Sequence, residues 1–403
     1  MTSTLPSRLG WWLFVVYLIL EFDRPPVLVQ LRLQMLIAIA LPLLWLGGRE
    51  RPWSPVLSAQ VGLLIVSAAT IPTAYNWYAA YFSTRILFSN VGIGIAMSWL
   101  LANREGMKRF HLAWMLVIGW TGLVGMIGGG RGTGGFLGDE NDLALACVGA
   151  FPFAFYGFQL LGGWQRWASA ACGLLVTGAT VMSFSRGGFV GLASALLYCI
   201  ATGAHRARNL ALAAVSAVAF LLAVPQSYLS EIYTISETES GTADSRQFLW
   251  ITAFNMWKEH PVLGVGGGNF NFQAGLYQPR GERWDRPEYQ ERNWSGTTVH
   301  SSYFQVLSEF GLLGTICFGA IAVGHLRGVA RTRRLAHRTR SLPKDLRNEI
   351  ELYGGSLTAG MIGILVSSAF LSAALYPYVY FFSGAGVAFV WWARRAIAES
   401  TTT

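Results

Sequence analysis

Charged residues are scarce in this chain. Only 13% of its 403 residues are Asp, Glu, Lys or Arg, whereas 53% are hydrophobic and 14% are aromatic. A soluble domain covers its surface with roughly 25% charged residues. The composition therefore excludes a soluble globular protein and makes lipid the solvent for much of the surface. The many aromatic residues fit belts at the two membrane interfaces.

Cysteine is also rare, and no two of the four cysteines stand at metal-ligand spacing. Each lies in an apolar run, so we interpret all four as small buried hydrophobic residues, not as disulfides or metal ligands. A small-residue cleavage site is missing after Arg8 as well, and the first apolar stretch is therefore expected to be a membrane helix. The cysteines are Cys147, Cys172, Cys199 and Cys317.

Long apolar runs are abundant instead. A membrane-spanning helix needs about 20 mostly apolar residues, and the chain holds twelve such candidates. We therefore predict an all-α polytopic protein with about twelve transmembrane helices and one large loop that contains short helices. The predicted spans are 9–22, 27–47, 54–72, 84–102, 109–128, 141–161, 166–183, 186–203, 208–224, 299–325, 351–374 and 376–393.

Lys and Arg are distributed unequally between alternate loops. The set that includes both chain ends holds almost twice as many as the other set. Cytoplasmic loops carry this excess, so both termini are predicted to be cytoplasmic and the large loop periplasmic. The net charge of +9 then reflects topology and not nucleic-acid binding. The expected organisation is helices one to nine in 1–224, a loop domain in 225–298, and three helices in 299–403 with a solvated basic loop at 326–348.

The first outer segment is glycine-rich and contains Arg131. It lacks the Lys-Ser/Thr ending of a phosphate-binding P-loop and follows no strand. Two interpretations of the next residues stay open. Asp139 or Asn141 caps the following helix, or Asp139, Asn141 and Asp142 bind a sugar.

Two further outer arginines stand at predicted helix starts, where free N–H groups and a partial positive charge favour anions. Ser185 can cap a helix that begins with Arg186, and the alternative for Arg186 is an interfacial arginine whose charged end reaches water. Arg246 begins an amphipathic helix on the membrane surface that ends at His260-Pro261. The alternative role for Arg246 is a structural ion pair with Asp244.

His300 stands at the start of the tenth predicted span. Thr297 or Thr298 would cap that helix, placing His300 in the first turn, where the helix dipole disfavours imidazolium. A neutral histidine can accept a proton from a hydroxyl or bond a phosphate oxygen; a purely structural histidine is the alternative. Deeper in the same helix, Glu309 is expected to pair with Arg32.

These segments, in this order, resemble the O-antigen ligase and polymerase superfamily of bacterial envelope proteins, over about Gly138–Gly314. The glycine-rich stretch 264–269, which alone suggests a tight turn closing the loop, is part of the pattern. The parts that carry the resemblance are Ser185-Arg186-Gly187-Gly188, Arg246 with His260 to Phe270, His300-Ser301-Ser302-Tyr303, and Leu307 to Gly314.

The resemblance implies a metal-independent, cofactor-free inner-membrane transferase of lipopolysaccharide biosynthesis, with its site facing the periplasm. The donor would be a glycan on undecaprenyl diphosphate, bound by Arg186 and Arg246, and His300 would be the base of an inverting transfer. Arg131, Arg85 and Tyr303 are further candidate substrate contacts. The acceptor is expected to be lipid A–core, with a second lipid-linked glycan or a protein hydroxyl as alternatives. A transporter or flippase is the rival class, although only Arg32 and Glu309 lie deep in predicted spans.

Overall fold

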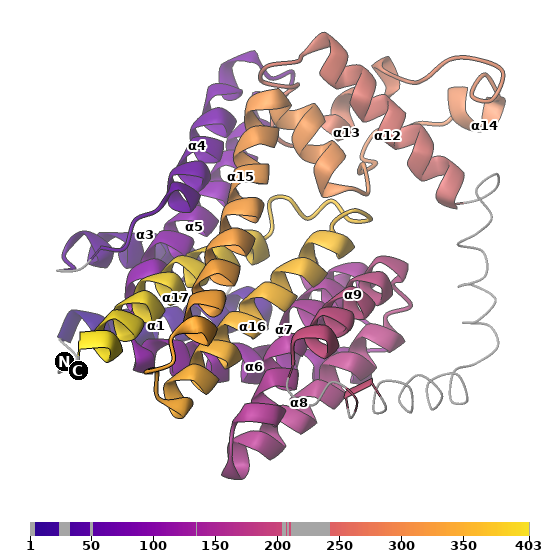
Figure 1. The fold of residues 1–403 in the computed structure, drawn as a ribbon. Coiled ribbons are helices and arrows are strands. Elements are labelled where there is room, and N and C mark those ends of the chain that lie inside the picture. The colour runs from indigo at the N-terminus through magenta and orange to yellow at the C-terminus, as the bar shows by residue number, and fades with distance from the viewer. Residues whose placement is uncertain are drawn as a thin grey trace.

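The computed structural model describes residues 5–23, 33–48, 51–133, 135–203, 207, 209–210 and 242–402. Over these ranges the chain is helical and contains no β-strand, which confirms the all-α prediction there. The long helices pack into one bundle, and a smaller helical segment lies over one end of it (Figure 1). Arg24, Arg32 and nearly all of the predicted span 208–224 lie outside the described residues.

The N-terminal part of the bundle follows the predicted spans closely, because polar caps stand where the apolar runs begin. Asn103 accepts a hydrogen bond from the Gly106 N–H at 2.8 Å and caps α6 in this way. The elements are α1 (Leu5–Phe22), α3 (Leu33–Leu46), α4 (Pro55–Ala69), η1 (Ile71–Thr73), α5 (Trp77–Leu100), α6 (Arg104–Ile127), η2 (Gly135–Gly138), α7 (Glu140–Leu160), α8 (Gly163–Met182) and α9 (Arg186–Thr202).

One start in this part differs from the prediction. Helix α5 begins at Trp77 and not near residue 84, because the side chain of Asn76 accepts from the Ala79 N–H at 3.1 Å. Arg85 therefore lies well inside the helix, with its guanidinium 4.7 Å from the centre of the Phe82 ring, and not at the helix start as the predicted span 84–102 implied.

Within the described ranges, five helices are long and apolar enough to cross a membrane. Two shorter apolar helices, α3 and α9, accompany them. This agrees with the predicted class of polytopic membrane protein, whereas the number twelve stays a prediction. The five are Pro55–Thr73, Arg104–Ile127, Glu140–Leu160, Ser302–Arg338 and Lys344–Ser367.

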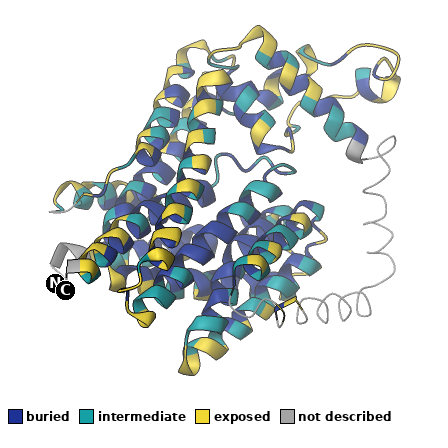
Figure 2. Cartoon of the chain, in the orientation of Figure 1, coloured by how far each residue is buried: buried dark blue, intermediate teal, exposed yellow. Residues whose placement is uncertain are grey.

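Burial also fits a bundle in lipid. The centre of the bundle is buried, and exposed residues follow the outer sides of its helices (Figure 2). Many of the exposed side chains are large and apolar, among them Ile65, Leu174 and Leu197, each more than 60% exposed. Water would disfavour such a surface, and lipid does not.

The C-terminal half adds the segment over the bundle end and three long helices. That segment has a hydrophobic core of its own, in which the Phe248 ring stacks on Tyr289 and Trp294 with centroids 4.9 and 4.7 Å apart. The elements are α12 (Thr242–Glu259), α13 (Phe270–Gln273), η4 (Ala274–Leu276), α14 (Pro287–Gln290), α15 (Ser302–Arg338), α16 (Lys344–Ser367) and α17 (Pro377–Thr402).

Helix α15 is broken at Gly311, whose φ of 62° and ψ of −158° are open to glycine. The stretch after α12 lies against the break and takes up the backbone groups there. The Val265 N–H donates to the Ser308 carbonyl at 2.9 Å, and the Leu312 N–H donates to the Pro261 carbonyl at 2.9 Å. The glycine-rich stretch is therefore a clamp on α15 and not only the tight turn that the sequence suggested.

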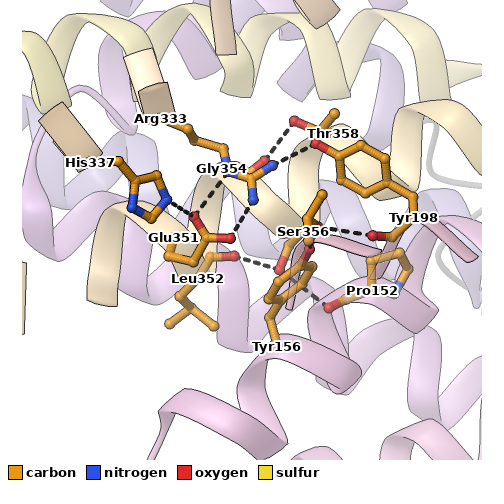
Figure 3. A network of polar contacts seen from close by, with 11 residues as sticks. Pro152, Tyr156, Tyr198, Arg333, His337, Glu351, Leu352, Gly354, Ser356 and Thr358 are labelled. Carbon is orange, nitrogen blue, oxygen red and sulfur yellow. Dashed lines mark hydrogen bonds and ion pairs between the residues drawn. The ribbon is translucent and has the colours of Figure 1, made fainter. Parts of the chain in front are cut away.

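The prediction of a solvated basic loop over residues 326–348 is wrong, because most of these residues are helical. Helix α15 continues to Arg338 and α16 begins at Lys344. Continuation of the helix buries Arg333, which pairs with Glu351 of α16 and donates to the Tyr198 hydroxyl of α9 at 2.6 Å (Figure 3). A buried charge has to be paired, and the partner lies in another helix, so the sequence of the basic stretch alone did not reveal it.

Candidate functional site

The first turns of α7 and α9 are joined by their caps. Asp139 caps α7 by accepting from the Asn141 N–H at 2.8 Å. Ser185 caps α9 by accepting from the Gly188 N–H at 3.1 Å. The Ser185 hydroxyl also donates to Oδ1 of Asn141 at 2.7 Å. Both predicted caps are confirmed, and the bond between them brings the two N-termini together.

Arg186 is the first residue of α9, as predicted. The backbone around it is held against α16, because the Ser367 hydroxyl donates to the Gly187 carbonyl at 3.0 Å. A Cβ on Gly191, one turn further, would lie 1.9 Å from the Ser367 oxygen. Close packing of α9 on α16 therefore sets the place of Arg186 relative to the chain that follows α16.

His300 lies before its helix and not in the first turn. The structure starts α15 at Ser302 with Ser301 as the N-cap residue, so the predicted caps Thr297 and Thr298 are wrong. The φ of His300 is 52°, in the left-handed region that costs a β-carbon residue about 1–3 kcal/mol.

Contacts with the segment after α16 hold this strained turn. The His300 N–H donates to the Ser372 hydroxyl at 3.0 Å, the Ser302 N–H donates to the Ser368 carbonyl at 2.8 Å, and the Ser302 hydroxyl donates to the Leu371 carbonyl at 2.7 Å. The sequence places residues 368–374 in the predicted membrane span 351–374. The signal that could have separated them is the presence of Ser367, Ser368 and Ser372 shortly before Pro377.

Arg246 lies in the second turn of α12, half-buried. Its proposed structural partner Asp244 is occupied by other groups, namely Arg283 at 2.6 Å and the hydroxyl of Tyr289. Burial and Asp244 raise the pKa of Tyr289 to about 12, so this hydroxyl remains a donor. Among the described residues, Arg246 has no hydrogen-bond or ion-pair partner.

Electrostatics link residues from four segments. Burial lowers the pKa of Arg246, and the positive charge of Arg186 lowers it further. Burial also lowers the pKa of His300, as does the charge of Arg246, while Asp139 acts in the opposite direction. The structure thus brings together Arg186, Arg246, His300 and Asp139, which we call the arginine–histidine cluster. In the described ranges no three His, Cys, Asp or Glu residues gather as metal ligands, and the positive charge here comes from arginine.

Such a cluster favours an anion. Two guanidinium groups that repel each other in a partly desolvated place gain free energy when a negative ligand enters between them. The N-termini of α7 and α9 add N–H groups and a partial positive charge on the same side. The uncharged imidazole beside them can accept a proton.

The other predicted contact residues each have a partner of their own. Arg131 pairs with Glu140 in the first turn of α7 at 3.1 Å, both partly exposed. Asp142 is buried and accepts from the Tyr376 hydroxyl at 2.7 Å. The Tyr303 hydroxyl donates to the Leu365 carbonyl at 2.7 Å. Together with Arg85 in α5, Asp142 and Tyr303 therefore have structural contacts outside the cluster.

Glu309 is buried below the cluster, where it holds the clamp in place. It accepts from the Phe270 N–H at 3.4 Å and from the Gln305 amide at 3.4 Å. The expected partner Arg32 lies outside the described residues. The contacts in view make Glu309 a bridge between α15 and the clamp that follows α12.

Residues 170–319 match the family model described as O-Antigen ligase. This confirms the resemblance inferred from the sequence over a range that contains Arg186, Arg246, His300 and Glu309. Asp139 and Asn141 stand before that range. No curated protein sequence matches the chain.

Proposed function

We propose that this chain, whose residues 170–319 match the O-antigen ligase family, transfers a glycan from undecaprenyl diphosphate to a hydroxyl group of lipid A–core. The observation that carries the proposal is the meeting of a half-buried Arg246, which has no partner among the described residues, with Arg186 and a neutral His300.

The two arginines are proposed to bind the diphosphate. A guanidinium bonds phosphate oxygens through two parallel N–H groups and keeps its charge at every physiological pH. Between Arg186 and Arg246, the diphosphate would relieve the repulsion that lowers the pKa of Arg246. The same contacts strengthen as the bond between the sugar and the diphosphate oxygen breaks, because negative charge then grows on that oxygen.

His300 is proposed to be the base. The acceptor hydroxyl oxygen attacks the anomeric carbon from the face opposite the diphosphate, and its proton passes to the imidazole. The electron pair of the broken carbon–oxygen bond leaves with the diphosphate. One displacement of this kind inverts the anomeric centre. Burial and the charge of Arg246 keep the imidazole uncharged and able to accept that proton.

The site is proposed to face the periplasm, with both termini in the cytoplasm of a bacterial inner membrane. The unequal distribution of Lys and Arg supports this direction. The cluster at the N-terminal end of α15 and the arginine-rich C-terminal half of the same helix then lie on opposite sides.

The proposal is tested by reconstituting the purified full-length protein with undecaprenyl-diphosphate glycan and three competing acceptors. These are lipid A–core, a second lipid-linked glycan, and a protein. We expect transfer to lipid A–core, and His300→Ala and Arg186→Ala to reduce it by about 10²–10³-fold each.

The matched control is Arg280→Ala, which removes an exposed arginine paired with Asp285 at 3.8 Å in the loop that follows η4. It should transfer normally. Normal transfer by both His300→Ala and Arg186→Ala would refute the site. Preference for a lipid-linked glycan or for a protein would keep the site and replace the acceptor.

A further inference from the structure

We propose that a groove beside the C-terminal half of α15, far from the arginine–histidine cluster, binds an anionic phospholipid of the membrane. The groove is lined by the start of α4 and the residues just before it, by α15 and by the middle of α17. Its residue His325 follows His300 by 25 positions, which corresponds to about 37 Å of helix. The inference therefore does not depend on the proposed transfer reaction.

The groove is large and has apolar walls. Its cavity volume is about 810 Å³, which falls in the range of sites for whole organic ligands. Val56, Val387 and Val390 line it. Gly324 and Gly328 also line it and have no side chains that would fill the space beside α15. Exposed Trp53 and Trp391 stand at its edge, as tryptophans do at the level of lipid headgroups.

Positive charge gathers along this apolar groove. Arg327, Arg331, Arg394 and Arg395 line it, and none of the described Asp or Glu residues does. Arg395 pairs with Glu399 at 3.5 Å. The other three are exposed and form no ion pair among the residues that the structure describes. Basic pockets between membrane helices attract phosphate headgroups in this way.

Two residues of the groove each carry a buried polar atom that has no hydrogen-bond partner in the described structure, and both suit such a headgroup. Ser54 is the N-cap residue of α4, but its hydroxyl makes no capping hydrogen bond and is unpaired. The N-terminus of α4 therefore offers free N–H groups to a phosphate. His325 is only 2% exposed, and its Nδ1 is unpaired while Nε2 lies 3.2 Å from the Leu357 carbonyl.

The histidine also points to the kind of headgroup. Because Nε2 faces a carbonyl oxygen, it has to carry the proton, and Nδ1 of the neutral ring is then an acceptor. It can take a hydrogen bond from a hydroxyl group. A phosphate that bears a glycerol hydroxyl, with acyl chains along Val387 and Val390, matches the charge, the acceptor and the apolar walls together.

The test measures the melting temperature of the purified full-length protein in detergent while phosphatidylglycerol is added. We expect a saturable rise, because a ligand that binds only the folded state stabilises it. Equal amounts of phosphatidylcholine or inorganic phosphate should produce no comparable rise. The triple variant Arg327→Gln/Arg331→Gln/Arg394→Gln should bind phosphatidylglycerol at least tenfold more weakly.

Two variants make the test specific. Arg334→Gln/Arg338→Gln/Arg340→Gln removes the same charge from exposed arginines that do not line the groove, and should behave as the wild type. Gly328→Leu keeps every charge but fills the apolar part; a Cβ there would lie 3.6 Å from a Val390 methyl group, an ordinary contact. It should lose the rise as well.

The proposal is overturned if phosphatidylcholine or inorganic phosphate raises the melting temperature as much as phosphatidylglycerol. It is equally overturned if both triple variants lose the rise alike. The lipid would then be attracted by the overall positive charge near the C-terminal end of α15 and not by the groove. Retention of the full rise in Gly328→Leu would contradict an occupied apolar groove.

Discussion

Buried or half-buried arginines near the two ends of α15 differ in whether they have a counterion. At the C-terminal half, buried Arg333 is satisfied by Glu351 and Tyr198, and His337 also reaches Glu351 at 3.2 Å (Figure 3). Beside the N-terminal end of α15, half-buried Arg246 of α12 is electrostatically coupled to His300 and Arg186 and has no counterion among the described residues.

The difference distinguishes an arginine that stabilises the fold from arginines that bind a ligand. A desolvated charge is costly, and a protein that only needs stability neutralises it with a carboxylate. Leaving two arginines beside each other lowers the stability of the empty protein. That arrangement makes physical sense where an anion completes it, and perturbed groups gather at functional sites for this reason.

The largest expected effect is at Arg246. Arg246→Ala should lower the rate of glycan transfer by about 10²–10³-fold, because it removes a donor that stabilises charge on the leaving diphosphate. Its melting temperature should equal or exceed that of the wild type, since the repulsion with Arg186 disappears. A transfer assay and a thermal scan check both. A large loss of stability with normal specific transfer would erase the contrast with Arg333.

The opposite pattern is expected at Arg333. Arg333→Ala leaves Glu351 partly buried without its main partner and should cost about 3–5 kcal/mol of stability. Transfer per folded molecule should remain normal. Denaturant unfolding in detergent measures the first, and the assay at low temperature the second. The double variant Arg333→Met/Glu351→Gln should recover part of the stability; failure to recover any would show that the pair is not the cause.

The break between the two halves can be tested at Gly311. Gly311→Ala places a Cβ 2.4 Å from the Val262 carbonyl at a φ of 62°, and we expect a loss of about 1–3 kcal/mol. The clamp should loosen, so proteolysis near residues 261–268 should accelerate. Gly319→Ala, in the same helix with open space around its Cβ, should be neutral or stabilising. Equal behaviour of the two variants would contradict the role of the break.

The smallest expected effect concerns pH. The pKa of His300 is lowered, so transfer should be constant around neutral pH and decline only in acid, as pH falls through that lowered pKa and the imidazole becomes protonated. Asp139→Asn removes the charge that opposes this lowering, while asparagine still caps the helix. The acid limb of the pH–rate profile should therefore move to lower pH. A move to higher pH would contradict the placement of Asp139 beside His300.

Local patterns were predictable from the sequence, and distant contacts were not. Ser185 and Asp139 each bond a backbone N–H two or three residues along the chain, so their capping follows from neighbours alone. His300 was misplaced because its turn is held by Ser368, Leu371 and Ser372, about 70 positions away. The start of α5 was predicted too late, and Arg85 with it too close to the helix end, because aromatic residues before Arg85 continue the helix.

The sequence by itself determined that this chain belongs in a membrane, that α9 begins at Arg186, and that α12 ends before Pro261. Composition and adjacent residues suffice for these properties, because burial in lipid, capping and the limits of proline act locally. Only the tertiary structure decided that the charge of Arg186 acts on Arg246 and that Arg333 pairs with Glu351. Their meeting depends on how whole helices pack, and the free energy of each charge depends on what that packing places beside it.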